Sequence, residues 1–411
     1  MKTYKHKKSV IALIIICSSV FLLTTCINKT GTDKDTVINL PDGNRLTGSA
    51  ACRNCHAALY DSFISTGHNL TSKPALKKYI RGSFEKDKNV YIYTAQDVVM
   101  MDALQDGFYQ VHYKNSKLDK SYRFDMVIGS GTRGQTFLHW EGNHLFQLPV
   151  SYYTLSDTWS NSPGYPDRKS VFNRKIIGDC LGCHNSYASI LNEDEKTGVS
   201  FDPDKIVYGV NCERCHGPGG KHVDFYSKHP DNKGTHEIIN PVQLTQRQQL
   251  DACAVCHSSG QKGVNAGLNF KTGDTITHSL SSAISIASKL DVHGNQYGLV
   301  VASRCFRESK TITCSSCHNT HQQERGNLAL FSKRCMNCHT PEGDKFCKMA
   351  ASLGKAALVN NCIDCHMPTR ESHTLNVKVT GVASHKPALL RTHFITVYPD
   401  ETKKILQLMK N

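Results

Sequence analysis

Seven copies of one short pattern, Cys-x-x-Cys-His, occur in this 411-residue chain. Two thiols at this spacing can add to the two vinyl groups of one porphyrin, and the histidine that follows places an imidazole under the iron. Each copy therefore predicts one covalently attached haem c, seven in all. The thiols are Cys52, Cys55, Cys180, Cys183, Cys212, Cys215, Cys253, Cys256, Cys314, Cys317, Cys335, Cys338, Cys362 and Cys365. The proximal iron ligands are His56, His184, His216, His257, His318, His339 and His366.

Zinc and disulfides explain this pattern less well. Structural zinc sites pair two Cys-x-x-Cys units, or one such unit with two histidines, and do not require histidine directly after each second cysteine. Disulfides do not require that histidine either. The seven histidines in the same position therefore favour haem attachment.

Histidine also supplies the candidates for the second axial position. An electron-carrying haem usually has a second protein ligand, often histidine, which keeps the iron six-coordinate. The chain has 21 histidines, more than the axial positions require, so their number does not show whether any haem has an open face. The candidate distal ligands are His321, His222, His68, His293 and His393. His321 lies three residues after His318 and could reach a neighbouring iron, and His222 closely follows the third motif.

Two further cysteines, Cys305 and Cys347, lie outside the motifs. They could form a disulfide, remain unreactive thiols, or supply one thiolate ligand to a haem. The first two interpretations are favoured.

The amino terminus predicts export. Four lysines within residues 1–8 precede an apolar run at 10–23, which is short for a membrane span and typical of a secretory signal over residues 1–25. Residues 23–26 then resemble a lipobox in which Cys26 is the lipid anchor, although Thr25 stands where a smaller residue is usual. Ordinary cleavage and an uncleaved anchor are the alternatives. All three place the remainder outside the cytoplasm, in the periplasm or at the cell surface.

The patterning predicts an α+β chain with an inserted antiparallel β region. Residues 26–47 are a polar tether, 48–83 a first haem segment with helical character over 56–81, and 84–165 a haem-free β region. Alternating apolar residues predict strands at 90–93, 108–113, 122–128 and 145–150. The glycine-rich stretch 129–134 is interpreted as a hairpin turn and not as a phosphate loop.

The remaining chain is dominated by haem motifs. Six of the seven lie in residues 166–366, which are too few residues per haem for a large protein core. Short helices, each with a motif near one end, should therefore pack around the porphyrins. Residues 367–411 form a tail that can supply distal histidines.

The formal charge of +14 invites a nucleic-acid interpretation. Each ferric haem with two ionised propionates carries about −1, so seven haems offset most of this charge. No nucleic-acid partner is expected.

Several phrases together resemble a known family. They are the run at 49–56 with Gly67-His68 after it, and those at 129–132, 148–151, 162–165, 180–185, 212–222, 314–321 and 362–368. In this order they resemble the bacterial multihaem cytochrome c family related to cytochrome c-554 and the doubled Cys-x-x-Cys-His domains, here with seven haems. The resemblance implies bis-histidine haems with closely packed porphyrins. It supports His68, His222 and His321 as distal ligands more strongly than His293 and His393.

Three functions remain open. The first is electron transfer between redox partner proteins, with a membrane quinol-linked complex as a candidate partner and a lipid anchor holding the chain at the membrane. The second is an oxidoreductase with one open haem that acts on a small nitrogen or sulfur oxyanion. The Cys-x-x-Cys-Lys motif of pentahaem nitrite reductases does not occur in this sequence, which disfavours but does not remove this hypothesis. The third, a haem-stabilised binding protein, is the least favoured.

Overall fold

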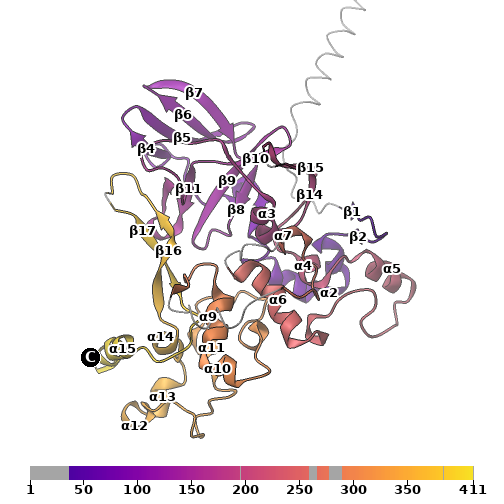
Figure 1. Ribbon diagram of the computed structural model, residues 1–411, viewed down its shortest axis with the longest axis vertical. Helices are drawn as coiled ribbons and strands as arrows, with labels where there is room; N and C mark the ends of the chain where they lie inside the picture. Colours follow the sequence, from indigo (N-terminus) through magenta and orange to yellow (C-terminus); the bar gives the residue numbers. More distant parts are fainter. Residues whose placement is uncertain (1–36, 195, 259–265, 277–288, 383, 411) are drawn as a thin grey trace, which may run out of the picture. The chain divides into compact units, whose positions relative to one another are not determined.

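The computed structural model describes residues 37–194, 196–258, 266–276, 289–382 and 384–410. The predicted signal sequence and Cys26 lie outside the described residues. Helices and strands are both abundant, which confirms the predicted α+β class (Figure 1). No helix in the described ranges is long and apolar enough to cross a membrane.

The β region begins with a four-stranded antiparallel meander. Its strands are β4 (Val90–Thr94), β5 (Asp97–Leu104), β6 (Gly107–Lys114) and β7 (Lys117–Arg123). The predicted strands at 90–93 and 108–113 correspond to β4 and β6. Strand β5 was not predicted, because its apolar residues do not alternate regularly.

A second antiparallel sheet is built around β9. Its strands are β3 (Ser72–Pro74), β8 (Met126–Ile128), β9 (Gly134–Glu141), β10 (His144–Gln147), β11 (Val150–Tyr153), β12 (Thr158–Asn161) and β13 (Arg174–Lys175). The predicted strand at 122–128 is divided between β7 and β8, which belong to different sheets. The turn predicted at 129–134 does join β8 to its antiparallel partner β9. Gly129 has a φ of 102°, and a Cβ there would lie 2.6 Å from the Gly134 carbonyl oxygen, so this turn requires glycine.

One apolar core joins the two sheets. Tyr91 and Val99 from the meander pack in a cluster with Phe124, Phe137 and Trp159. The Trp159 indole nitrogen donates to the Ser83 carbonyl oxygen at 2.7 Å, so its polar edge is satisfied. The β region therefore has a protein core of its own.

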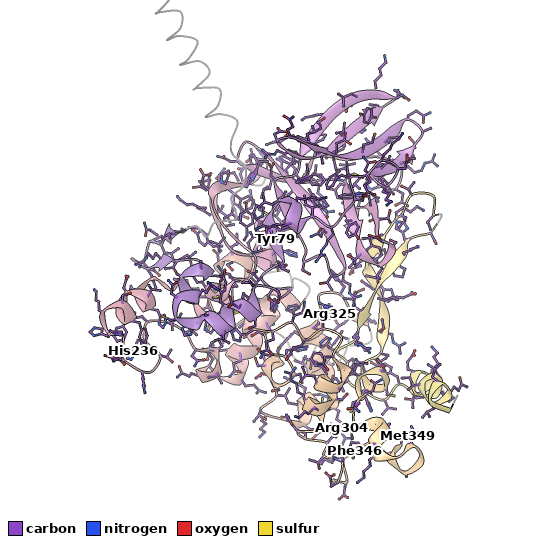
Figure 2. The ribbon with its side chains drawn as sticks, turned by 180° about the vertical axis from the view of Figure 1, so that it is seen from behind. Tyr79, His236, Arg304, Arg325, Phe346 and Met349 are labelled. Carbon is purple, nitrogen blue, oxygen red and sulfur yellow. The ribbon has the colours of Figure 1, made fainter. Side chains whose placement is uncertain are left out.

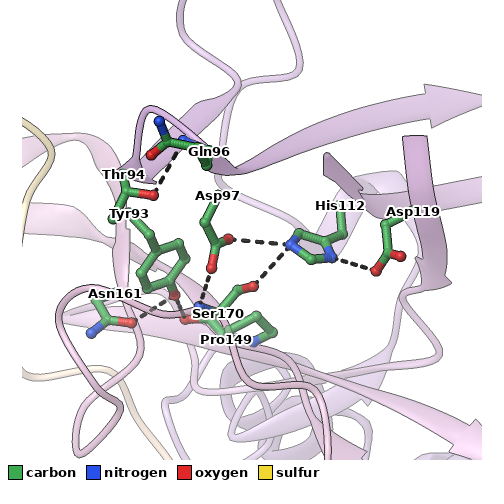
Figure 3. Close-up of polar contacts among 9 residues, drawn as sticks. All are labelled: Tyr93, Thr94, Gln96, Asp97, His112, Asp119, Pro149, Asn161 and Ser170. Atoms are coloured by element: carbon green, nitrogen blue, oxygen red, sulfur yellow. Dashed lines mark hydrogen bonds and ion pairs between the residues drawn. The ribbon is translucent and has the colours of Figure 1, made fainter. Parts of the chain in front are cut away.

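A buried polar network closes one side of this region (Figure 3). His112 on β6 contacts the carboxylates of Asp119 at 2.8 Å and Asp97 at 3.2 Å, and the Ser170 hydroxyl lies 3.1 Å from its Nε2. The Ser170 amide donates to Asp97 at 2.9 Å. Because Asp97 and Ser170 share the same ring nitrogen, that nitrogen is not free to act as a base toward the serine. The network ties the 170s loop to the sheet.

Short helices carry the motifs, as predicted. They are α2 (Ser49–Phe63), α3 (Gly178–His184), α4 (Cys212–His216), α6 (Gln246–His257), η5 (Cys314–Ser316), α11 (Leu328–Cys335) and α14 (Ile363–His366). Helix α2 begins earlier than the helical stretch expected at 56–81 and ends at Phe63, after which the chain forms turns, β3 and η1 (Lys77–Tyr79). The other helices are α5 (Gly220–Lys228), η2 (Thr154–Ser156), η3 (Pro241–Gln243), α7 (Ala266–Asn269), α9 (Gln296–Ala302), α10 (Arg304–Glu308), α12 (Ala350–Leu353), α13 (Lys355–Leu358) and α15 (Pro399–Lys410).

Two long hairpins were not predicted. The first pairs β14 (Asn185–Asp194) with β15 (Gly198–Tyr208), inside the segment expected to hold only short helices and loops. The second pairs β16 (Thr369–Val377) with β17 (Lys386–Arg391) in the tail. The tail hairpin binds the β region, where Asn161 donates its amide to the Lys378 carbonyl at 2.8 Å (Figure 1).

Part of the expected tether is also structured. Residues 38–46 contain the small hairpin β1 (Ile38–Asn39) and β2 (Arg45–Leu46). Ile38 and Leu46 are buried against Val207 of β15. These two apolar side chains supply packing contacts that the mostly polar composition of the segment did not predict.

Candidate haem sites

The seven predicted sites are numbered 1 to 7 in chain order by their proximal histidines, His56, His184, His216, His257, His318, His339 and His366. On a helix, residues i, i+3 and i+4 lie on one face. The motifs in α3, α4 and α6 therefore present both thiols and the imidazole on the same side. The motif in α2 ends at a kink, because His56 has non-helical backbone angles. Site 5 uses the short η5 turn, site 6 begins where α11 ends, and site 7 lies on α14.

The motif thiols are partly accessible. Cysteine is among the most buried residue types in proteins, yet all fourteen motif cysteines are half-buried or exposed. His257 is likewise exposed, although burial lowers the pKa of its ring. Accessible thiols and imidazoles fit the attachment of a cofactor.

Four proximal imidazoles have a second imidazole opposite them. The ring centres are 6.5 Å apart for His56 and His222, 6.1 Å for His216 and His321, 6.1 Å for His318 and His393, and 6.2 Å for His257 and His68. A metal–imidazole bond of about 2 Å places two axial rings about 6 Å apart, centre to centre. Each gap is therefore wide enough for one iron, and four of the five histidines predicted as distal ligands line such a gap.

The fifth predicted distal ligand, His293, lies near both site 2 and site 4. Burial lowers the pKa of His184 and of His257, and electrostatic repulsion from His293 contributes to both shifts. The assignment of His293, like that of the other distal ligands, stays a prediction.

The distal histidines come from segments other than those that carry the thiols. His222 on α5 follows the motif of site 3 but faces site 1. His68 follows the motif of site 1 but faces site 4. His321 follows the motif of site 5 but faces site 3, and His393 reaches site 5 from the tail. The candidate ligands thus cross-connect distant parts of the chain.

Hydrogen bonds orient these rings, and nothing in the sequence indicated which residues accept them. A carbonyl oxygen can only accept, so an imidazole Nδ1 bonded to one must carry the proton, which leaves Nε2 for a metal. Such Nδ1 contacts join His216 to Ile239 at 2.9 Å, His222 to His236 at 2.8 Å, His257 to the side chain of Gln296 at 3.2 Å, His339 to Lys345 at 2.8 Å and His366 to Thr396 at 3.0 Å. His184 has the Thr71 hydroxyl at 2.8 Å. His236, which supplies one of these carbonyls, lies beyond α5 (Figure 2).

Two of the candidate distal histidines are held neutral by burial. Burial lowers the pKa of His68 and of His393 to about 4. An imidazole binds a metal only when it is unprotonated. Both rings are therefore in the ligating form at neutral pH.

Sites 6 and 7 differ from sites 1, 3, 4 and 5 in the second axial position. Among the described residues, no second imidazole is stacked opposite His339 or His366. His373 binds Asp291 through its backbone amide, and the His385 ring lies 3.0 Å from Asp167. His339 is exposed. The sixth position of these two sites has no histidine assigned to it.

A buried carboxylate that the sequence did not single out connects sites 1 and 3. Glu213, inside the motif of site 3, accepts from the backbone amides of Thr47 and Gly48 at 2.9 Å each and of Gly219 at 2.8 Å. It thereby fixes the start of α2 against α4. An acidic residue between two motif cysteines carries no distinctive signature, so spacing alone could not reveal this role.

Cys305 and Cys347 are free thiols and are not joined to each other. Burial raises the pKa of Cys305, which disfavours the thiolate. Whether these residues are unreactive thiols or one of them supplies a thiolate ligand stays a prediction.

Comparisons with known proteins found cytochromes. The family model described as cytochrome c554 and c-prime matches residues 158–217. Multiheme cytochrome MtrA of Shewanella baltica (strain OS185) is 24% identical over 209 residues, which cover 48% of this chain and 55% of that protein. The chain thus spans about half the length of this curated relative. The crystal structure of outer cell wall cytochrome OcwA has a similar fold, with a TM-score of 0.52 and 16% identity, covering 87% of this chain and 81% of that one.

Proposed function

Because this chain belongs to the multihaem c-type cytochromes, we propose that it binds seven haems and carries electrons between redox partner proteins. The observation that carries the proposal is the set of four imidazole pairs, with ring centres 6.1 to 6.5 Å apart. A histidine on each face leaves no open position for a substrate. Such sites exchange electrons without forming bonds to a substrate.

The protein's part in this reaction is to hold and tune the sites. Haem iron, when bound, supplies a ferric–ferrous couple. The paired histidines keep the coordination unchanged, and the hydrogen bonds to Nδ1 fix the ring orientation and raise ligand basicity. Differences in burial and nearby charge among the sites should spread their potentials.

Two measurements on the oxidised, purified protein test the carrier function. A pyridine haemochrome assay should give seven haems per chain. Electron paramagnetic resonance should show low-spin ferric signals from at least sites 1, 3, 4 and 5. A high-spin signal that accounts for most of the haem would contradict the proposal.

A second candidate function rests on sites 6 and 7. Neither has a histidine opposite its proximal ligand among the described residues, so either could hold a five-coordinate haem that acts on a small nitrogen or sulfur oxyanion. A stoichiometric high-spin signal that shifts when nitrite or hydroxylamine is added would favour this oxidoreductase function.

The location follows the proposed signal sequence. We propose that the chain is exported to the periplasm or cell surface, is held at a membrane through lipidated Cys26, and receives or donates electrons through a quinol-linked membrane complex. Metabolic labelling with a radioactive fatty acid should mark the wild type and not the Cys26→Ala variant. Equal labelling of both proteins would exclude this anchor.

A further inference from the structure

One buried carboxylate lies at the start of two helices. Glu213 belongs to the motif of site 3 on α4 and is only 6% exposed. Its Oε1 accepts from the amides of Thr47 at 2.9 Å and Gly219 at 2.8 Å, and its Oε2 accepts from the amide of Gly48 at 2.9 Å. Gly48 directly precedes α2, and Gly219 directly precedes α5. A single side chain therefore binds the amino-terminal ends of both helices.

Both helices take this contact from outside themselves. In a capping box, a glutamate or glutamine at the third position of a helix accepts from the amide of the residue that precedes the helix. That third position is Ala51 in α2 and His222 in α5, so neither helix has the required side chain. Each preceding residue is also a glycine, which has no side chain that could act as a cap. Glu213 supplies the acceptor for both ends, where the helix dipoles favour a negative charge.

The same two helices carry the candidate axial pair of site 1. His56 lies on α2 and His222 lies on α5, with ring centres 6.5 Å apart. One iron can bind both rings only while the centres stay about 6 Å apart. The position of α5 relative to α2 therefore decides whether site 1 keeps two histidines.

Other contacts show how closely the start of α5 lies against the chain before α2. The Asn44 side-chain oxygen accepts from the Lys221 amide at 3.1 Å. A Cβ on Gly220 would lie 3.0 Å from the Arg45 carbonyl oxygen, so only glycine fits at this position without a shift of the backbone. The two segments are thus in direct contact, and Glu213 is the buried group between them and α4.

We infer that Glu213 is a positioning residue for site 1, although it belongs to the motif of site 3. It holds α2 and α5 so that His56 and His222 stay within reach of one iron. The inference rests on the proposed binding of haem at site 1. The axial pair of site 3 consists of His216 and His321, which do not lie on α2 or α5, so loss of Glu213 should affect site 1 first.

A Glu213→Gln substitution tests this role in the full-length, haem-loaded protein. The glutamine amide nitrogen donates and does not accept, so it would face a backbone amide that also donates. One helix end should be released, and site 1 should lose His222 as its sixth ligand. Electron paramagnetic resonance should show one added high-spin haem per chain, while the pyridine haemochrome assay gives an unchanged haem content. His222→Ala should give the same signal, and the double variant should show no more than one high-spin haem.

An Asp224→Asn substitution is the matched control. Asp224 on α5 pairs with Arg45 at 2.7 Å and so joins the same two segments, but it is exposed. Exposed ion pairs contribute little, so this variant should keep the wild-type spectrum. An equal high-spin signal in the Asp224→Asn variant, or no added high-spin signal in Glu213→Gln, would overturn the inference.

A milder variant covers the case in which Glu213→Gln does not fold. Glu213→Asp keeps the charge but is shorter by one methylene, so it cannot reach both helix ends. It should give a smaller high-spin fraction, which imidazole added in solution converts to low spin. A wild-type spectrum of Glu213→Asp would contradict the positioning role. An unchanged spectrum of His222→Ala would instead contradict the pairing of His56 with His222, on which the proposed function rests.

Discussion

At the scale of single residues, the central feature is a neutral imidazole opposite another. His393 lies in the tail, far along the chain from the motif whose histidine it faces, with ring centres 6.1 Å apart. His385, from the same tail, is bound to Asp167 on the surface. Two histidines that look alike in the sequence therefore have different roles.

Replacing His393 by alanine should convert one of the seven ferric haems from low to high spin, because site 5 loses its second axial ligand. Electron paramagnetic resonance measures the change, and haem content should stay at seven. The matched His385→Ala variant should keep the wild-type spectrum. If both variants gave the same high-spin fraction, the assignment of His393 would be wrong.

Acid should destabilise the protein through these histidines. Burial lowers the pKa of His68 and His393 in the folded protein, and coordination to iron would also hold both rings unprotonated. Below pH 6.5 the unfolded chain therefore binds protons that the folded chain does not, and the free energy of unfolding falls as the pH falls. Guanidinium unfolding at pH 7 and pH 5 should show the loss.

A His68→Met variant provides the control for this pH effect, because methionine does not titrate. Its unfolding free energy should change less between pH 7 and pH 5 than that of the wild type. An identical pH dependence in both proteins would mean that other groups cause the acid sensitivity.

The sequence predicted which residues attach haem better than it predicted which histidines lie opposite each other. The motif fixes two thiols and one imidazole because local chemistry demands that spacing. The distal candidates His222 and His321 stood out because they follow a motif closely. Their partners were hidden, since His222 faces His56 and His321 faces His216, and such pairing depends on how distant segments pack.

At the scale of elements, two kinds of core divide the chain. The β region packs Tyr91, Phe137 and Trp159 around one apolar centre. The helices around site 4 have a smaller cluster that includes Leu250 and Tyr297. Alternation predicted β4, in which buried and exposed residues alternate, and the run of aromatic and apolar residues predicted β6. Alternation did not predict the hairpin β14–β15, whose register is broken by bulges.

His112→Ala should destabilise the β region without disturbing the haems. The variant leaves Asp97 and the Ser170 hydroxyl without their shared partner, at a cost of about 3 kcal/mol, which is typical of breaking a buried polar or ionic network. Hydrogen exchange should speed up in β5 and β6. The exposed Glu193→Ala on β14 serves as a control and should have little effect.

Haem content and the low-spin spectrum should stay as in the wild type in the His112→Ala variant. A loss of haem would mean that the β region supports the attachment sites more directly than the contacts of His112 indicate.

At the scale of the whole molecule, we expect the motif helices to fold only when haem is attached. The haem-binding segments leave their thiols partly accessible and have little apolar core of their own. Expression without the haem-attachment machinery should therefore leave the strands β4 to β12 folded and the motif helices unfolded. Limited proteolysis should cut within 212–366 and spare 90–161.

The haem-loaded protein is the control for this experiment and should resist cleavage in both regions. Protection of the motif helices in the haem-free chain would show that their protein contacts suffice for folding.

The cross-connection of distal histidines has a consequence for how such a chain can evolve. With the distal ligands proposed above, a haem site is not a transferable module, because its thiols and its sixth ligand are encoded in different stretches. Deleting the stretch that holds site 3 would also remove His222, the residue that faces the iron position of site 1. Gain or loss of one haem by recombination would thus alter two irons at once. Sites that depend on two stretches of the chain should evolve by point substitution more readily than by exchange of segments.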